Sequence, residues 1–221
     1  MDKAIKAAIF DLDGVLVDTA QYHYLAWRRV AEALSISFTE EDNERLKGVS
    51  RSQSLDYVLQ KGNEAMTADE KREWASRKNT WYLEYLAGLN ESHLLPGARA
   101  YVDSLKKAGV RIGLGTSSRN AGIILERLRI QDWFDAVVDG SMVAQTKPDP
   151  EVFLKCAQLL QVQPECCLVL EDSAAGIEAA KNAGMKCVGI GDKLLLKEAD
   201  LVVSGLRELL LSPVRYKEAA P

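Results

Sequence analysis

Two aspartates directly follow an apolar stretch near the start of the sequence, in the segment A-A-I-F-D-L-D-G-V-L-V-D-T. Residues two apart in an extended chain point in the same direction, so the carboxylates of Asp11 and Asp13 are expected to share one side. An ionised Asp11 can act as a nucleophile, and Asp13, partly protonated beside other acids, can act as a general acid and then as a general base. For a motif this short, the alternative is a pair of solvated acids at the end of a strand. Phosphoryl transfer would also need positive charge nearby, because a carboxylate repels a phosphate dianion.

Polar residues also follow three later apolar stretches. They are Thr116, Ser117, Ser118, Arg119 and Asn120 after residues 110–115, Lys147 after residues 136–139, and Glu171 and Asp172 after residues 167–170. Taken singly, the hydroxyl-rich group could be a helix N-cap, and Lys147 could be a solvated surface lysine. If these residues meet at the carboxyl edge of one parallel sheet, the hydroxyls can donate hydrogen bonds to phosphate oxygens, and the acids can bind Mg²⁺ rather than a softer metal. Together the four strand ends predict one phosphoryl-transfer site.

Short apolar stretches alternate with helix-like segments in the first and last parts of the sequence, which predicts a parallel sheet with helices on both faces. From about Leu16 to Leu95 there is no convincing strand, and the sequence indicates amphipathic helices up to the L-P-G punctuation at residues 95–97. We therefore expect an α/β core domain formed by residues 1–15 and 96–221, with an inserted α-helical cap domain at residues 16–95.

The bulk composition is typical of a folded protein: 221 residues, 47% hydrophobic and 27% charged, with a formal net charge of −4. This charge gives no general attraction to nucleic acid or to anionic membranes. No apolar stretch approaches transmembrane length and the first residues lack a signal-peptide pattern, which predicts a cytoplasmic protein. The four cysteines (Cys156, Cys166, Cys167 and Cys187) lack zinc-site spacing and are expected to be reduced packing residues. A redox role for the adjacent pair is the alternative.

The motifs D-L-D-G-V, the hydroxyl of Thr116, K-P-D-P and E-D-S-A-A-G occur in the order of the four motifs of the haloacid dehalogenase-like phosphotransferases. The chain resembles that superfamily over its whole length. The resemblance implies a Rossmann-like core and an enzyme that depends on Mg²⁺.

The same resemblance implies a role for each matching residue. Asp11 would form an aspartyl-phosphate, and Asp13 would move the proton and lend its backbone carbonyl to Mg²⁺. Thr116 and Lys147 would hold the transferring phosphoryl group. The metal residues implied in this way are Asp11, Asp13, Asp172 and, in support, Glu171.

Two segments of the predicted cap could take part in binding. Thr19, His23 and Trp27 are spaced four apart and share one helix face, although such a face is more often used for packing. The segment L-K-G-V-S-R-S-Q-S at residues 46–54 combines two cations, a glycine and hydroxyls, although it could also be an ordinary helix–helix connection.

Together with R-K-N at residues 77–79, these segments resemble the hexose-phosphate mutases, a subgroup of the superfamily. By this resemblance, His23 would help to poise Asp13, and Lys78 would contact the sugar phosphate. Arg51, with Ser118 and Asn120, would hold the phosphate group that does not react. The whole expected binding set is Thr19, Trp27, Leu46, Lys47, Gly48, Val49, Ser50, Arg51, Ser54, Lys78, Ser117, Ser118, Arg119 and Asn120. The sequence departs from the subgroup at Thr116, where serine is frequent, and at Arg119, where lysine is expected.

The implied reaction interconverts β-glucose 1-phosphate and glucose 6-phosphate, with β-glucose 1,6-bisphosphate as intermediate and as primer. The expected partners are small sugar phosphates, and the protein is expected to act as a monomer. A sugar-phosphate phosphatase would release inorganic phosphate and form no isomer. A haloacid dehalogenase would have no use for Asp13 or Mg²⁺, and a non-catalytic metabolite-binding protein would usually lack a catalytic group that is present here.

Overall fold

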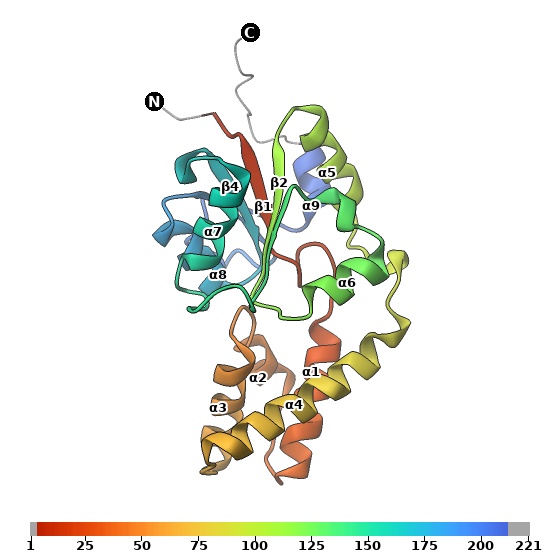
Figure 1. The fold of residues 1–221 in the computed structure, drawn as a ribbon, viewed down its shortest axis with the longest axis vertical. Helices are drawn as coiled ribbons and strands as arrows, with labels where there is room; N and C mark the ends of the chain where they lie inside the picture. Colours follow the sequence, from red (N-terminus) through yellow and green to blue (C-terminus); the bar gives the residue numbers. More distant parts are fainter. Residues whose placement is uncertain (1–3, 212–221) are drawn as a thin grey trace. The chain divides into compact units, whose positions relative to one another are not determined.

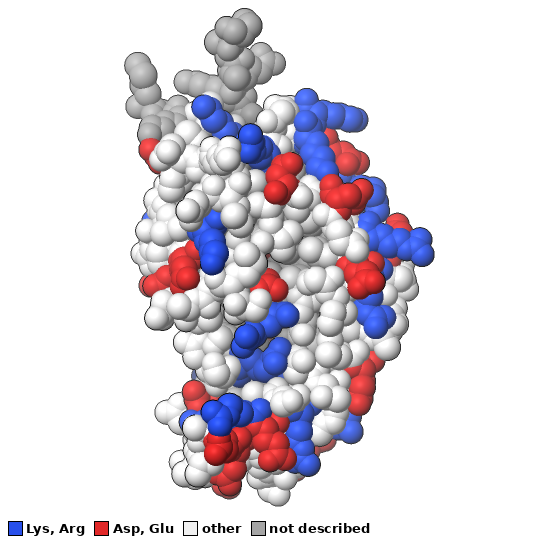
Figure 2. Space-filling view, in the orientation of Figure 1, with Lys and Arg blue, Asp and Glu red and all other residues white. Residues whose placement is uncertain are grey.

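The computed structural model describes residues 4–211, which form two compact units. Residues 4–18 and 90–211 make the first unit, the core, and Thr19–Leu89 make the second unit, the cap. The range predicted for the cap from the sequence, residues 16–95, includes all residues of this second unit. Residues 1–3 and 212–221 of the predicted core lie outside the described residues. In the view of Figure 2, acidic and basic side chains are interspersed over the surface of each unit.

The core contains a six-stranded parallel sheet within the described residues, in the order β3-β2-β1-β4-β5-β6. The strands are β1 (Ala7–Phe10), β2 (Arg111–Gly115), β3 (Ala136–Val138), β4 (Cys167–Glu171), β5 (Lys186–Ile190) and β6 (Leu201–Val203). Every residue of β1 and β4 is buried, as expected for central parallel strands covered on both faces. The predicted doubly covered parallel sheet is thus confirmed.

Helices lie on both faces of this sheet, with α7 and α8 on one side and α5 and α9 on the other (Figure 1). The helices of the core are α5 (Ala98–Lys107), α6 (Ala121–Leu128), α7 (Glu151–Leu160), α8 (Ala174–Asn182) and α9 (Leu206–Leu211), and the 3₁₀ turns are Glu91–His93, Gln131–Trp133 and Pro164–Cys166. Successive strand residues point to opposite faces, so Ile9 packs in the cluster that contains Phe153 of α7, whereas Phe10 meets the edge of the Tyr101 ring of α5. The core therefore has two apolar layers, one on each side of the sheet.

The register of the sheet places the functional strand ends at one level. Phe10 is paired with Leu114 of β2 and with Leu170 of β4. The residues that come next in each strand, Asp11 and Glu171 among them, therefore lie at the same carboxyl edge, where open α/β sheets bind ligands.

The cap is a set of helices: α1 (Ala20–Ala33), α2 (Glu40–Glu44), α3 (Arg51–Gly62) and α4 (Ala68–Tyr85), followed by the 3₁₀ turn Leu86–Gly88. Thr39, Ser50 and Thr67 each begin a helix with a reciprocal capping box. Apolar residues from α1 and α3, with Phe38 and Leu46, form the apolar core of the cap.

The two segments that join the units are hydrogen-bonded to each other within the core. Val17 forms isolated bridges with Asp13 and with Leu94, and Leu95 N donates to Leu16 O at 2.9 Å. The segment that leaves the core and the segment that returns to it thus lie side by side.

All four cysteines are free thiols, and three of them are buried. Burial raises the pKa of Cys156 and of Cys167 to about 12, so these thiols stay protonated at neutral pH. This arrangement fits a packing role. Within residues 4–211, no helix has both the length and the apolar character needed to cross a membrane.

Candidate active site

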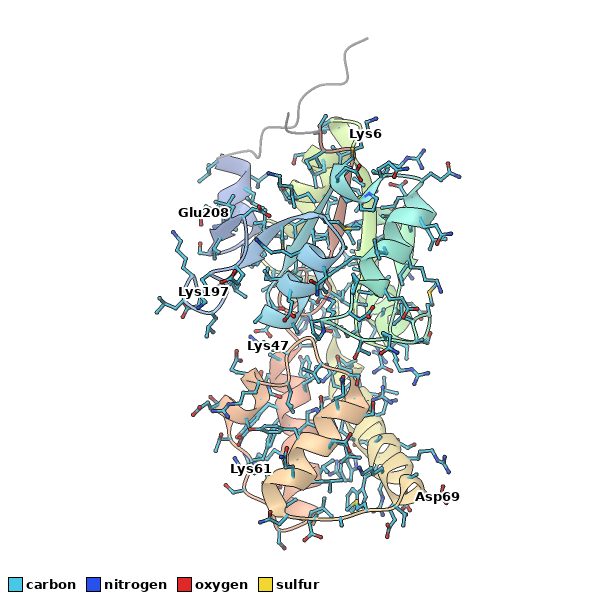
Figure 3. All side chains as sticks on the ribbon, turned by 90° about the vertical axis from the view of Figure 1, so that its left-hand side faces the viewer. Lys6, Lys47, Lys61, Asp69, Lys197 and Glu208 are labelled. Atoms are coloured by element: carbon cyan, nitrogen blue, oxygen red, sulfur yellow. The ribbon has the colours of Figure 1, made fainter. Side chains whose placement is uncertain are left out.

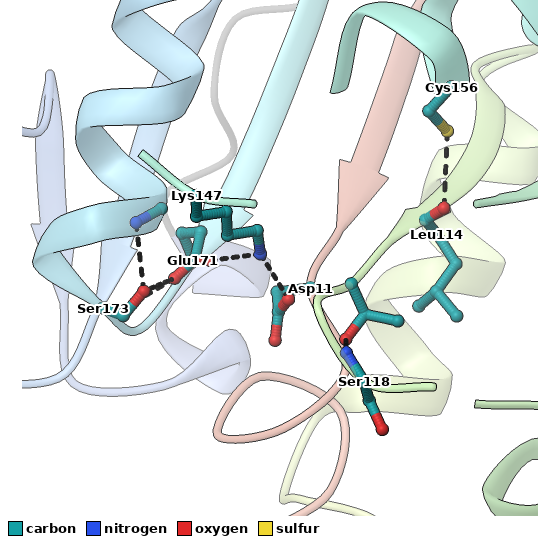
Figure 4. Close-up of polar contacts among 9 residues, drawn as sticks. Asp11, Leu114, Ser118, Lys147, Cys156, Glu171 and Ser173 are labelled. Atoms are coloured by element: carbon teal, nitrogen blue, oxygen red, sulfur yellow. Dashed lines mark hydrogen bonds and ion pairs between the residues drawn. The ribbon is translucent and has the colours of Figure 1, made fainter. Parts of the chain in front are cut away.

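A buried lysine joins two of the predicted strand ends (Figure 4). Lys147 Nζ donates to Asp11 Oδ1 at 2.5 Å and to Glu171 Oε1 at 2.6 Å. Its side chain is completely buried, and it reaches the sheet edge from the loop before α7. A solvated surface lysine, the alternative for this residue, is therefore wrong.

The environment of the cluster shifts the pKa values of Asp11 and Lys147. Burial raises the pKa of Asp11 to about 7, and the positive charge of Lys147 offsets this only in part. Burial alone would lower the pKa of Lys147, but the charges of Asp11 and Glu171 outweigh it and raise that pKa above its ordinary value. Lys147 is thus a permanent cation shared by two carboxyl groups.

Glu171 is the residue that holds Lys147 in place. Its Oε1 accepts from Lys147, and its Oε2 accepts from Ser173 N at 2.7 Å and from Ser173 Oγ at 2.9 Å. Ser173 Oγ in turn accepts from Gly176 N at 3.1 Å and caps α8. A Cβ atom on Gly176 would lie 1.8 Å from Glu171 Oε1, so the carboxylate occupies space that only glycine leaves open.

Asp172 lies against the loop that carries the two aspartates. A Cβ atom on Gly14 would lie 2.1 Å from Asp172 Oδ2, and Gly14 has a φ of +80°. Asp13 and Asp172 are both partly exposed, whereas Asp11 and Glu171 are buried. The structure thus brings all four predicted acids to the carboxyl edge of β1 and β4.

These residues fit Mg²⁺. Among residues 4–211, no three His, Cys, Asp or Glu side chains form a metal-ligating group. Mg²⁺ does not need one, because it is commonly held by one or two carboxylates and keeps several water molecules. Asp11 and Glu171 share one lysine cation, and Asp13 and Asp172 lie at the same edge of the sheet, so the acids outnumber the cation and a hard cation would balance them. Asp11, the backbone carbonyl of Asp13 and Asp172 would supply the oxygens, and the fully bonded Glu171 is better suited to support.

The hydroxyl-rich loop follows β2, the strand that pairs with β1. Thr116 is buried, and its backbone N–H donates to Val138 O at 3.0 Å. Ser118 N donates to Thr116 Oγ1 at 3.2 Å, and Asn120 N donates to Ser118 Oγ at 3.3 Å. Ser117 and Ser118 are partly exposed and Arg119 is exposed. The loop leads directly into α6, so backbone and side-chain donors are available for an anion.

Within the cap, the predicted helix face contains a histidine–lysine pair. Lys78 Nζ lies 2.8 Å from His23 Nδ1, and it also lies 4.8 Å from the ring centre of Trp27 and 4.7 Å from that of Tyr82. An ammonium group can only donate, so Nδ1 accepts and the ring proton belongs on Nε2. Sequence reasoning missed Tyr82, although its position four residues after Lys78 on α4 was a usable signal.

The remaining predicted cap residues have structural tasks as well. Thr19 is buried immediately before α1, Trp27 lies in the apolar core of the cap, and Leu46 lies in the same core. Ser50 caps α3, and Ser54 is buried within that helix. Lys47 pairs with Glu44 at 2.9 Å, Gly48 has a φ of +73°, Val49 N donates to Leu46 O at 3.2 Å, and Arg51 is half-buried at the start of α3.

The electrostatics of the pair give a first prediction. Burial, followed by the positive charges of Lys78 and Arg51, holds the pKa of His23 well below its ordinary value of 6.5. His23 is therefore neutral near pH 7. A Lys78→Met variant removes one of these charges, and we expect the pKa of His23 to rise, measured by NMR titration of the ring protons. Arg77→Met on the same helix is the control, and an equal rise there would contradict the assignment.

The site agrees with comparisons to known proteins. A model of the haloacid dehalogenase-like hydrolases matches residues 5–184. The chain is 47% identical to β-phosphoglucomutase of Bacillus subtilis, over 94% of this chain and 92% of that protein. It is 33% identical to a phosphorylated-carbohydrates phosphatase of Thermotoga maritima, over 96% and 99% of the two chains. The crystal structure of β-phosphoglucomutase from Clostridium difficile is 41% identical, with a TM-score of 0.90 and 93% of each chain covered. The chain belongs to the haloacid dehalogenase-like hydrolase family.

Proposed function

We propose that the protein is a β-phosphoglucomutase, a Mg²⁺-dependent enzyme that interconverts β-glucose 1-phosphate and glucose 6-phosphate. The observation that carries the phosphoryl transfer is the buried Asp11–Lys147–Glu171 cluster at the carboxyl edge of the sheet. The 47% identity to β-phosphoglucomutase of Bacillus subtilis favours a mutase. It combines a carboxylate nucleophile with a fixed cation, which is what attack on a phosphate dianion requires.

The cycle starts with phosphorylated Asp11. The 6-hydroxyl of β-glucose 1-phosphate attacks the phosphorus while the bond from phosphorus to Asp11 breaks, and Asp13 takes the proton of that hydroxyl. The bisphosphate turns over, and the Asp11 carboxylate then attacks the phosphorus at the 1-position while the bond to the sugar oxygen breaks; this oxygen takes the proton back from Asp13. Lys147 holds the negative charge that builds up on the phosphoryl oxygens, and the Thr116 hydroxyl donates to one of them. When bound, Mg²⁺ would neutralise charge on the phosphoryl group.

A mutase must bind two phosphate groups, because its bisphosphate intermediate is used in both orientations. We propose that Arg51, with Ser118 and Asn120, binds the phosphate group that does not react, that the rest of the loop at residues 46–51 takes part in substrate binding, and that Lys78 contacts the sugar phosphate. Glucose 1,6-bisphosphate would serve as primer by phosphorylating Asp11. We also propose that the protein acts as a monomer in the cytoplasm.

We propose that His23 helps to poise Asp13 once the sugar is bound. Its neutral state and its proton on Nε2 suit it to donate a hydrogen bond to a carboxyl group. A His23→Ala variant is expected to lower the mutase rate by about 10²-fold, in the range of a lost acid–base contribution. Binding of Mg²⁺ to the core, measured by calorimetry, should remain. A mutase rate equal to that of the unaltered protein would refute this role.

The test of the function follows two products side by side. The protein is supplied with β-glucose 1-phosphate, Mg²⁺ and a trace of the bisphosphate, and glucose 6-phosphate and free phosphate are both measured. A mutase forms glucose 6-phosphate with little free phosphate, and the α anomer should be a poor substrate. Stoichiometric release of phosphate from several sugar phosphates, with no isomer, would instead identify a phosphatase. Addition of EDTA should stop the reaction in either case.

A further inference from the structure

One buried carboxylate of the cap has no assigned chemical role. Asp42 of α2 is 5% exposed, and its oxygens accept from Thr39 N at 2.8 Å, Thr39 Oγ1 at 2.9 Å and Tyr57 OH at 2.8 Å. Lys61 Nζ makes an ion pair with the same group. Burial alone would raise the pKa of Asp42, but the hydrogen bonds from Lys61, Thr39 and Tyr57 together lower it. Asp42 is thus an ionised, fully bonded side chain.

The donors to Asp42 come from both sides of one connection. Thr39 begins α2, whereas Tyr57 and Lys61 are four residues apart on one face of α3. Helix α2 has only five residues, too few to be stable without tertiary contacts. Asp42 supplies such contacts, since it ties the short helix to the C-terminal half of α3.

The segment closed by these bonds contains the proposed phosphate loop, defined as Leu46–Arg51. It runs from α2 to α3 and carries Lys47, Gly48 and Ser50 (Lys47 and Lys61 are labelled in Figure 3). Its two flanking helices are linked by the bonds of Asp42 to Tyr57 and Lys61, and a contact that fixes both helices limits the conformations open to the loop between them. A loop that is already ordered binds its ligand more tightly, because less entropy is lost on binding.

We propose that Asp42, through Tyr57 and Lys61, is a positioning residue that holds the loop Leu46–Arg51 ready for the non-reacting phosphate of the sugar. The proposal rests on the proposed function, in which this loop binds that phosphate. Asp42 touches no substrate in this account. It affects the binding of substrates that are held both at Asp11 and by the loop Leu46–Arg51, and it leaves the phosphoryl-transfer chemistry at Asp11 unchanged.

The test uses substrates with and without a second anchoring point. In an Asp42→Asn variant, we expect KM for β-glucose 1-phosphate to rise about tenfold, and in Tyr57→Phe about fivefold, as for the loss of one or two hydrogen bonds. The kcat should change less than about twofold in each, since the transition-state contacts in the core remain. Hydrolysis of acetyl phosphate, a phosphoryl donor without a sugar or second phosphate, should keep its rate in both variants.

The control is Asp56→Asn on the same helix. Asp56 pairs with Lys71 at 2.6 Å on the exposed surface between α3 and α4, so its loss should leave KM unchanged. Tyr57→Phe keeps the ring in the cap and removes only the hydroxyl, so it provides a folded variant even where Asp42→Asn unfolds; thermal unfolding of each variant checks this. An unchanged KM in Tyr57→Phe, or an equal loss of acetyl phosphate turnover, overturns the proposal. Failure of the unaltered protein to form glucose 6-phosphate would overturn the proposed function instead.

Discussion

An Asp11→Asn variant is expected to lose mutase activity by at least about 10⁴-fold, in the range found when a nucleophile is removed. The amide has nearly the same shape as the carboxylate, but its oxygen is neutral and a weak nucleophile. Lys147 keeps its bond to Glu171, so the cluster stays assembled around the inactive side chain. The measurement is the initial rate of glucose 6-phosphate formation, with mass spectrometry to detect a phosphoryl adduct on the protein.

The matched control is Asp103→Asn. Asp103 is an exposed aspartate on α5, so the same change of one carboxylate to an amide should leave the rate unaltered. A normal rate in the Asp11→Asn variant, or an adduct that forms on another residue, would contradict the assignment of Asp11 as nucleophile.

A Gly176→Ala variant is expected to lower kcat on the order of 10²-fold, although Gly176 is not a catalytic residue. The added Cβ would overlap Glu171 Oε1, and Glu171 is completely buried and has no open space to enter. Displaced Glu171 would no longer hold Lys147 in line with Asp11. Overpacking should also lower the free energy of unfolding by about 1–3 kcal/mol. Steady-state kinetics and urea unfolding measure the two effects.

Gly122→Ala provides the comparison. Gly122 lies in α6, and a Cβ there would meet no atom within 4 Å. This variant should keep its activity and gain about 0.5–1 kcal/mol, because alanine favours a helix. If the two alanine variants behaved alike, the role of Glu171 in placing Lys147 would be wrong.

The sheet could be predicted from the sequence because its strands are buried on both faces. A buried parallel strand is a short continuous apolar run, as in Ala7–Phe10 and Cys167–Leu170, and such runs stand out between helical segments. The predicted and observed strand ranges differ at their ends: the apolar stretch at residues 136–139 ends as a strand at Val138, and the stretch at residues 167–170 continues as a strand to Glu171. The ends of an element depend on tertiary contacts, which hydrophobic periodicity does not report.

The sequence predicts which residues form the site, but it does not predict the contacts between them. Asp11 and Glu171 are recognisable because they lie at strand ends, and Lys147 because it begins the motif K-P-D-P after a third strand; parallel strands bring their ends together. That one lysine would be shared by both carboxylates depends on register and on the path of the loop, which are tertiary. The same holds for Tyr82 and Asp42, whose importance comes from partners distant in the sequence.

The pairing of Val17 with Leu94 has a consequence for how such a protein can diversify. The chain leaves and re-enters the core at one junction, where the two backbone segments are hydrogen-bonded to each other. A domain inserted at this junction can be lengthened, shortened or replaced by another domain without a change in the strand order of the core. Exchange of the inserted domain can therefore change the substrate preference, while the residues of the core that carry out phosphoryl transfer stay the same.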